Sequence, residues 1–305
     1  MRGVPGGSAC ASRGEVPPAS DPAAGPVARE VVATPPPGGV VVGARALRSE
    51  AGGETRECVA QEVAVAFELD GASQVVMLAT PTDLDDFALG FCLTEGWIAR
   101  PEELLVCEIR LRERGIVLAL TLAPAAGASR DAPRRNLVGR TGCGLCGTDD
   151  LAGVVRLPAE GLPSTRVDSG AFARAMAELA HRQPLGRATG ATHAAALCDL
   201  DGRVRLVRED VGRHNALDKL IGAMLRAGLD PTASFVAVTS RASVEMVQKT
   251  ALAGVSILAA VSAPTQLAIQ VARDAGLLLA GFVREGRATI YAGAARVTDR
   301  GGETD

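Results

Sequence analysis

The second half of the chain alternates short apolar runs with stretches of helical period, and this alternation constrains the fold more than any other feature. Strands are predicted at 192–198, 203–207, 235–239, 255–261, 277–283 and 288–291, and helices at 169–181, 213–226, 243–253 and 265–275. The first two strands are expected to form a hairpin-like pair around Asp201-Gly202. Strands that alternate with helices of this length are typical of a largely parallel sheet covered on both faces. We therefore expect an α/β fold over residues 166–305.

The first half predicts a smaller α+β region at 45–122. The run Glu62–Leu69 alternates and ends at an Asp-Gly turn, and Val75–Ala79 is its expected hairpin partner. Acidic residues after Pro81 open a helix whose apolar side chains recur at helical spacing. Two more strands are predicted at 104–111 and 116–122.

Two segments show no regular period. Residues 1–44 are rich in Gly, Pro and Ala, with three consecutive prolines at 35–37, which predicts a disordered leader. Residues 123–165 contain scattered Pro and Gly and are predicted to form a loop or linker. This linker contains the sequence TGCGLCG at 141–147.

Composition excludes several classes of protein. The 305 residues are 47% hydrophobic, which is enough for a sizeable core. A net charge of −3 and an aromatic content of 3% argue against a nucleic-acid binder. The chain has neither a run of about 18 apolar residues nor the apolar stretch of a signal peptide, so we expect no membrane segment and a cytoplasmic location. Seven scattered cysteines do not suggest a disulfide framework.

Lysine occurs only at Lys219 and Lys249, so nearly all positive charge is arginine. Genomic base composition is the simplest explanation. The bias means that any anion site in this chain would use guanidinium groups or backbone N–H groups.

Cys143 and Cys146 form the single C-x-x-C pair, and several chemistries fit this spacing. A structural zinc site needs four ligands, but the sequence has no second pair and no closely spaced histidines, so no structural metal is expected. A thioredoxin-like dithiol normally precedes a helix, whereas this pair follows an irregular loop and precedes two aspartates. The pair could also simply fill a tight turn.

The third chemistry is a sulfur relay through a persulfide. A carrier cysteine must reach two different sites, and a glycine-flanked loop allows that reach. Arg134, Arg135 and Arg140 lie nearby in sequence and would favour the reactive thiolate. A second thiol three residues on could release the sulfur by forming a disulfide.

Polar turns follow several predicted strands. In the stretch Arg208–Lys219, Asp210 is expected to cap a helix, and the backbone N–H groups there suit an anion. His214 is either a general acid or base, or a group that only fixes the turn. The turns Thr239–Ser243 and Ser262–Thr265 repeat the pattern, and Arg241 suits a phosphate. Together they suggest one phosphate-bearing ligand across the edge of the sheet.

A last turn lies at Glu285-Gly286, flanked by Arg284 and Arg287. On residue types alone it is an ordinary hairpin with solvated arginines.

Taken together, these stretches resemble the formate dehydrogenase accessory sulfurtransferase family (FdhD). The matching segments run in order from about residue 57 to 291 and are PTDLDDFALGFCLTEGWI at 81–98, TGCGLCG at 141–147, TGATHAAAL at 189–197, REDVGRHNALDKLIG at 208–222, TSRASVEMVQKTALAGV at 239–255, SAPTQLAI at 262–269 and GFVREGRATIY at 281–291. The combination is specific, although no single segment would be.

The resemblance implies a sulfurtransferase that passes persulfide sulfur from a cysteine desulfurase to the bis(molybdopterin guanine dinucleotide) molybdenum cofactor of formate dehydrogenase. It implies that Cys143 bears the persulfide, with Cys146 as its partner. It also implies that Phe282, Val283, Arg284, Glu285, Gly286 and Arg287 contribute to cofactor binding, and that the protein could form a homodimer.

The resemblance further implies a cytidine-deaminase-like, three-layer C-terminal domain. Deaminase chemistry itself is not expected, because that reaction needs an H-x-E motif and His193 is followed by two alanines. Two alternatives stay open: a cofactor-binding chaperone or thiol-disulfide protein that transfers no sulfur, and a nucleotide hydrolase on the same scaffold.

Overall fold

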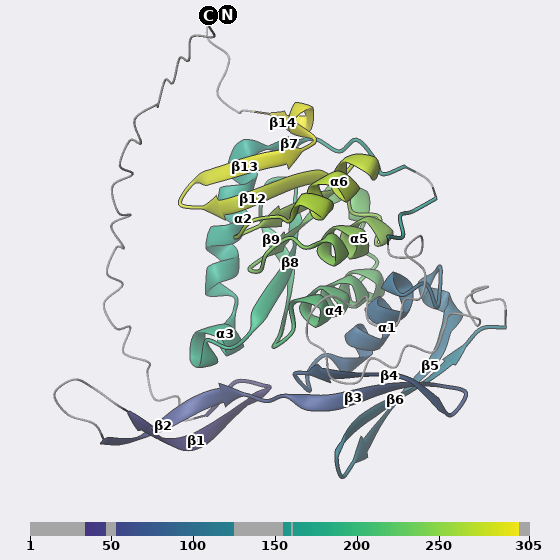
Figure 1. Ribbon diagram of the computed structural model, residues 1–305, viewed down its shortest axis with the longest axis vertical. Helices are drawn as coiled ribbons and strands as arrows, with labels where there is room; N and C mark the ends of the chain where they lie inside the picture. Colours follow the sequence, from purple (N-terminus) through teal and green to yellow (C-terminus); the bar gives the residue numbers. More distant parts are fainter. Residues whose placement is uncertain (1–33, 47–52, 125–154, 160, 299–305) are drawn as a thin grey trace, which may run out of the picture. The chain divides into compact units, whose positions relative to one another are not determined.

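The computed structural model describes residues 34–46, 53–124, 155–159 and 161–298. Its N-terminal region starts with an antiparallel ribbon and continues into a four-stranded sheet with the order β4-β3-β6-β5 (Figure 1). The elements are β1 (Gly39–Ala46), β2 (Gly53–Ala60), β3 (Val63–Leu69), β4 (Ala72–Ala79), α1 (Leu84–Thr94), η1 (Pro101–Glu103), β5 (Leu104–Arg112) and β6 (Gly115–Leu122).

Helix α1 packs on one face of this sheet through aromatic side chains. Phe67 of β3 lies under Phe87 and Phe91 of α1, with ring centroids 5.1 and 4.3 Å apart. All three rings are buried in one core with Leu118 of β6. The expected α+β region is therefore confirmed, including the hairpin of β3 and β4.

The C-terminal region is built on a six-stranded sheet with the order β13-β12-β11-β10-β8-β9. Its strands are β8 (His193–Asp199), β9 (Val204–Asp210), β10 (Ser234–Val238), β11 (Ile257–Ala260), β12 (Leu278–Arg284) and β13 (Arg287–Ala292). Its helices are α2 (Ser169–His181), α3 (Pro184–Thr189), α4 (Arg213–Arg226), α5 (Val244–Leu252) and α6 (Gln266–Asp274). Short pieces complete it: β7 (Val167–Asp168), η4 (Pro231–Ala233), η5 (Ala294–Arg296) and β14 (Val297–Thr298).

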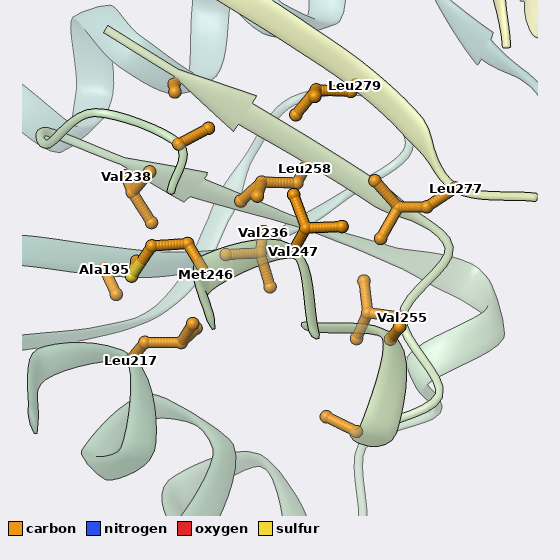
Figure 2. Packing of buried hydrophobic residues seen from close by; sticks show 14 of the residues in the cluster. Ala195, Leu217, Val236, Val238, Met246, Val247, Val255, Leu258, Leu277 and Leu279 are labelled. Carbon is orange, nitrogen blue, oxygen red and sulfur yellow. The ribbon is translucent and has the colours of Figure 1, made fainter. Parts of the chain in front are cut away.

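Helices cover both faces of this sheet, so the three-layer α/β/α class is confirmed. On one face Leu217 of α4 and Met246 and Val247 of α5 pack against Val236 and Leu258 of the sheet (Figure 2). On the other face Phe172 of α2 meets Phe235 of β10, with ring centroids 5.5 Å apart. No helix in the described ranges is long and apolar enough to cross a membrane.

The expectation of a largely parallel sheet is wrong at both edges. The parallel pairs are β10 with β11 and β11 with β12, although β9 also runs in the direction of these strands. Strand β8 is antiparallel to β10 and to β9, and β13 is antiparallel to β12. The two hairpins expected from the sequence, β8 with β9 and β12 with β13, are confirmed, and a hairpin forces its two strands to be antiparallel. The antiparallel pairing of β8 with β10 was not predicted.

The predicted leader 1–44 is also wrong in its last residues, because β1 begins at Gly39 and pairs with β2. Three consecutive valines at 40–42 supply the β propensity that the Gly- and Pro-rich surroundings conceal. Residues 1–33 lie outside the described part of the chain. The expected boundaries at 122 and 165 stay predictions.

Helices α1 and α4 join the two regions in close backbone contact. A Cβ atom on Gly90 would lie 1.8 Å from the carbonyl oxygen of Asp218, and one on Gly222 would lie 1.9 Å from that of Asp86. Only glycine fits at either position, so the two helices cross at these residues. The crossing fixes α4, and therefore the polar turn at its start, against the N-terminal region.

Candidate functional site

One edge of the C-terminal sheet gathers the polar turns. The parallel strands β10, β11 and β12 end there, and the antiparallel strand β8 begins there at His193, which pairs with Asp210 at the end of β9. Helices α4, α5 and α6 start just beyond the ends of β9, β10 and β11. We call this the carboxyl edge. In open α/β sheets, ligands bind at this edge.

Backbone hydrogen bonds hold the turns of the carboxyl edge in one row. Thr239 N donates to Ala194 O at 3.0 Å, which ties the turn after β10 to the start of β8. Ala242 N donates to Ala263 O at 3.2 Å, and Phe282 N donates to Ser262 O at 3.2 Å. The expected series of turns is therefore adjacent in space.

The most unusual feature of the carboxyl edge is a group of buried polar side chains. His214 Nε2, near the start of α4, lies 2.6 Å from Oε2 of Glu245, in the first turn of α5. The buried Oγ of Ser243, just before α5, makes no hydrogen bond within the described residues. Buried polar atoms usually have such partners, and leaving one without a partner costs about 1–3 kcal/mol.

The carboxyl edge carries positive charge. Burial lowers the pKa of His193, and electrostatic interactions with Arg213 and His214 lower it further, whereas Asp210 opposes this effect. Burial, followed by the charge of Arg241, also lowers the pKa of Arg213, while Glu245 opposes this effect. Electrostatic interactions therefore link His193 to Arg213 and His214, and Arg213 to Arg241. Such a cluster attracts an anion.

The predicted segment from Phe282 to Arg287 borders this edge. Phe282 has φ of 50° and lies in a bulge of β12, and its ring is 39% exposed. Val283 is buried, while Arg284 lies 5.8 Å from the ring centre of Phe282. Glu285, with φ of 52°, and Gly286 form the expected turn, and Arg287 pairs with Glu285 at 2.7 Å.

A bulky residue with positive φ is a rare and strained conformation. The bond from Phe282 N to the turn after β11 holds the strain in place. The segment is therefore more than an ordinary hairpin, since an exposed aromatic ring and two exposed arginines project at its end.

The expected helix cap at Asp210 is wrong, because α4 is capped by Gly212 and Asp210 has another role. The carboxylate of Asp210 is fully buried and lies 2.7 Å from Nζ of Lys219. It also accepts hydrogen bonds from Asn215 Nδ2 and from Thr80 N of the N-terminal region. These bonds join the two regions directly behind the carboxyl edge.

The second lysine, Lys249 of α5, forms a similar buried network around Asp218 of α4. Lys249 Nζ donates to both oxygens of Asp218 at 2.9 Å and to Thr94 Oγ1 of α1 at 2.8 Å. It also lies 3.3 Å from Oε1 of Glu95. Although burial by itself lowers the pKa of Lys249, Asp218 and Glu95 outweigh it and raise the pKa, so the lysine is charged.

Arg156 fastens the described residues 155–159 to this network. Its guanidinium donates to the carbonyl oxygen of Glu95 at 2.5 Å and lies 3.3 Å from the Glu95 carboxylate. Its backbone N donates to Gln248 Oε1 at 2.9 Å. The chain that follows the predicted cysteine pair is thereby attached to α1 and α5.

Cys143 and Cys146 lie outside the described residues, as do Arg134, Arg135 and Arg140. The structure therefore does not test their predicted roles. Among the described residues, no group of three or more His, Cys, Asp or Glu side chains could hold a metal ion.

Sequence reasoning missed the buried networks and Glu245. The rarity of lysine could have indicated the buried networks. In a chain whose other basic residues are arginines, the two lysines suggest positions where arginine does not fit. Glu245 carried no such signal, since its closeness to His214 depends on how α4 and α5 pack.

Comparison with known proteins places the chain in a family. The model of the FdhD/NarQ family matches residues 60–298. A protein of Variovorax paradoxus named sulfur carrier protein FdhD is 54% identical over 255 residues, covering 82% of this chain and 89% of the relative. One of Cupriavidus necator with the same name is 53% identical over 234 residues, covering 77% and 81%.

A solved structure supports the fold. The crystal structure of a candidate formate dehydrogenase accessory protein from Desulfotalea psychrophila superposes with a TM-score of 0.67. It covers 86% of this chain and 100% of its own, at 24% identity. At that identity the likeness concerns the fold alone.

Proposed function

Because this chain belongs to the FdhD/NarQ family, we propose that it carries sulfur from a cysteine desulfurase to the bis(molybdopterin guanine dinucleotide) molybdenum cofactor destined for formate dehydrogenase. Its close relatives are named sulfur carrier proteins. On this proposal it is a sulfurtransferase with a persulfide intermediate that works in the cytoplasm. The desulfurase and formate dehydrogenase are its expected partners.

The observation that carries the cofactor part of the proposal is the polar cluster of the carboxyl edge. A guanine dinucleotide contains a diphosphate group, which needs several donors and positive charge. The carboxyl edge offers Arg213 and Arg241, the start of α5 and the buried hydroxyl of Ser243, which has no hydrogen-bond partner among the described residues. A ligand that accepts a hydrogen bond from Ser243 would remove the cost of leaving that buried hydroxyl without a partner.

The exposed ring of Phe282 and the exposed guanidinium groups of Arg284 and Arg287 are further groups that suit a guanine dinucleotide. A flat aromatic ring provides a surface for a planar heterocycle, and exposed arginines provide further phosphate contacts. The bulge that turns Phe282 outward is strained, which is common at ligand sites. We therefore assign Phe282–Arg287 to the rim of the cofactor site.

The sulfur step is proposed for Cys143. Its thiolate attacks the outer sulfur of the desulfurase persulfide, so that a new S–S bond forms on Cys143 and the desulfurase thiolate leaves. The Cys146 thiolate can then attack the Cys143 sulfur and release the outer sulfur as sulfide. That second step oxidises the two cysteines to a disulfide, which a cellular thiol must reduce before the next cycle.

The binding half of the proposal is tested by calorimetry with GDP, which presents a guanine base and a diphosphate. We expect Arg241→Ala to weaken GDP binding about tenfold or more, since a hydrogen bond to a charged group contributes about 1.5–3 kcal/mol. Arg203→Ala is the matched control, because Arg203 is an exposed arginine in the turn at the opposite end of β8 and β9. Equal GDP affinity in wild type and Arg241→Ala would contradict the assignment.

A cofactor-binding chaperone that never carries sulfur is the second candidate. The same cluster supports it, since binding groups alone would suffice for that role. It predicts normal GDP binding and no sulfur on Cys143 after incubation with a desulfurase. The sulfurtransferase predicts both.

A further inference from the structure

A cavity of about 390 Å³ opens beside β9, and residues 205–209 of this strand line it. Strand β9 is the last strand in the order of its sheet, so no strand of the described residues pairs with its outer edge. The cavity is also lined by Pro184 and Leu185 at the start of α3, and by Thr82 and Asp83, which precede α1. Its volume is in the range of pockets that hold ligands.

The alternation of the hydrogen-bond ladder identifies the backbone groups at this outer edge. Ala194 of β8 uses its backbone on the β10 side, since its N–H donates to Thr239 Oγ1 at 2.9 Å and its carbonyl oxygen accepts from Thr239 N at 3.0 Å. Glu209, which lies opposite Ala194 in β9, is therefore in a non-hydrogen-bonded pair, and its own N–H and C=O point outward. Val207, two residues earlier, points the same way.

A bulge in β9 sets the direction of Arg205. Leu206 pairs with Leu197 and Val204 pairs with Cys198, which leaves Arg205 as the extra residue. Bulges at sheet edges often turn a side chain toward a binding site. Arg205 is exposed, lines the cavity, and makes no hydrogen bond or ion pair with another described residue.

The other charged side chains that line the cavity already have partners. The carboxylate of Glu209 accepts two hydrogen bonds from backbone N–H groups of α3, at 3.0 and 2.7 Å. Arg208 lies 3.4 Å from Asp83, and Arg182 lies 3.2 Å from Glu178. The guanidinium of Arg205 is thus the charge of this lining that lacks a counter-ion among the described residues. It suits a carboxylate from outside.

We propose that the outer edge of β9 binds an extended acidic segment of a partner protein, which adds a strand beside Val207 and Glu209 and places a carboxylate on Arg205. In this mode of recognition, backbone hydrogen bonds supply affinity and side-chain contacts supply specificity. A small free anion would use Arg205 but not the backbone groups two residues apart. The inference is independent of the proposed sulfur and cofactor chemistry, since none of these three residues has a role in either.

The test uses fluorescence anisotropy of a labelled hexapeptide of alternating valine and glutamate, titrated with the full-length chain. A second hexapeptide with methylated backbone nitrogens keeps the charge and loses the N–H donors, and a third carries lysine in place of glutamate. The variant is Arg205→Glu. Arg112→Glu is the matched control, because Arg112 is an exposed arginine of β5, the edge strand of the other sheet, and the change in net charge is the same.

We expect wild type and Arg112→Glu to bind the acidic hexapeptide equally. Arg205→Glu should bind it about tenfold more weakly, because a repulsion replaces an exposed ion pair of similar size. The methylated and lysine hexapeptides should bind poorly to every protein. Hydrogen exchange should slow at the N–H groups of Val207 and Glu209 when the acidic hexapeptide is bound, and stay unchanged in β5.

Four results would overturn the inference. They are no binding of the acidic hexapeptide to wild type, equal affinity in Arg205→Glu, no protection of Val207 and Glu209, and equal affinity for the methylated hexapeptide, which would mean that the site recognises charge alone. Should Arg205→Glu not fold, the comparison of the hexapeptides on wild type decides.

Discussion

The glycine crossing of α1 and α4 gives a quantitative prediction about stability. In Gly222→Ala the new Cβ would lie 1.9 Å from the carbonyl oxygen of Asp86, a backbone atom that cannot swing aside. The helices would have to separate by about 1 Å, and overpacking of this kind costs about 3 kcal/mol at the upper end of the usual range. Alanine regains about 1 kcal/mol through its higher helix propensity.

We therefore expect Gly222→Ala to lower the free energy of unfolding by about 2 kcal/mol, measured by urea denaturation. Gly170→Ala in α2 is the matched control, because its Cβ would meet the flexible end of Arg174 at 2.8 Å. That variant should be as stable as wild type or more stable by up to about 1 kcal/mol, through the higher helix propensity of alanine.

Gly90→Ala should resemble Gly222→Ala, and the double variant should lose less than the sum, because the helices separate only once. A Gly222→Ala protein as stable as wild type would refute the reasoning, since it would mean that the helix crossing is not closely packed.

Three further predictions concern single side chains. Phe282→Gly should raise the free energy of unfolding by up to about 1 kcal/mol, because it removes the strain of φ at 50°. The same variant should weaken GDP binding. Lower stability in urea than wild type would contradict the prediction. Lys249→Met should lower the free energy of unfolding by about 3–5 kcal/mol, since it leaves Asp218 buried without its cation; an unchanged urea midpoint would contradict it. Because the pKa of His193 is lowered by burial, the unfolded chain binds a proton that the folded chain does not, so stability falls as pH drops below about 6.5. His193→Gln should lose less stability than wild type between about pH 7 and pH 5 in thermal unfolding, and an identical pH profile would refute this.

Local patterns in the sequence were sufficient for most elements of the fold. The apolar stripe of α4 predicts 213–226, which are the bounds observed, because one buried face demands a regular period. The antiparallel pairing of β8 with β10 could not be predicted from the sequence, because a short buried strand has the same apolar pattern whichever way it runs. Strand β1 was missed because neighbouring prolines and glycines conceal its valines.

Part of the candidate site could also be predicted from the sequence. Turns at strand ends follow from chain order, so Arg241 could be singled out, whereas the Phe282–Arg287 segment was selected only through the family resemblance. Asp210 was assigned to a helix cap because it precedes α4, whereas its true partner, Lys219, lies further along the same helix. The pairing of His214 with Glu245 is a product of packing between helices.

The central claim is that Cys143 carries sulfur, and intact-mass spectrometry tests it most directly. The protein is incubated with an active cysteine desulfurase and cysteine, alongside Cys143→Ala, Cys146→Ala and the control Cys58→Ala, a half-buried cysteine of β2. The account predicts a gain of one sulfur atom in wild type and Cys58→Ala that reductant removes, and no gain in Cys143→Ala. No gain in wild type, or an equal gain in Cys143→Ala, would contradict it.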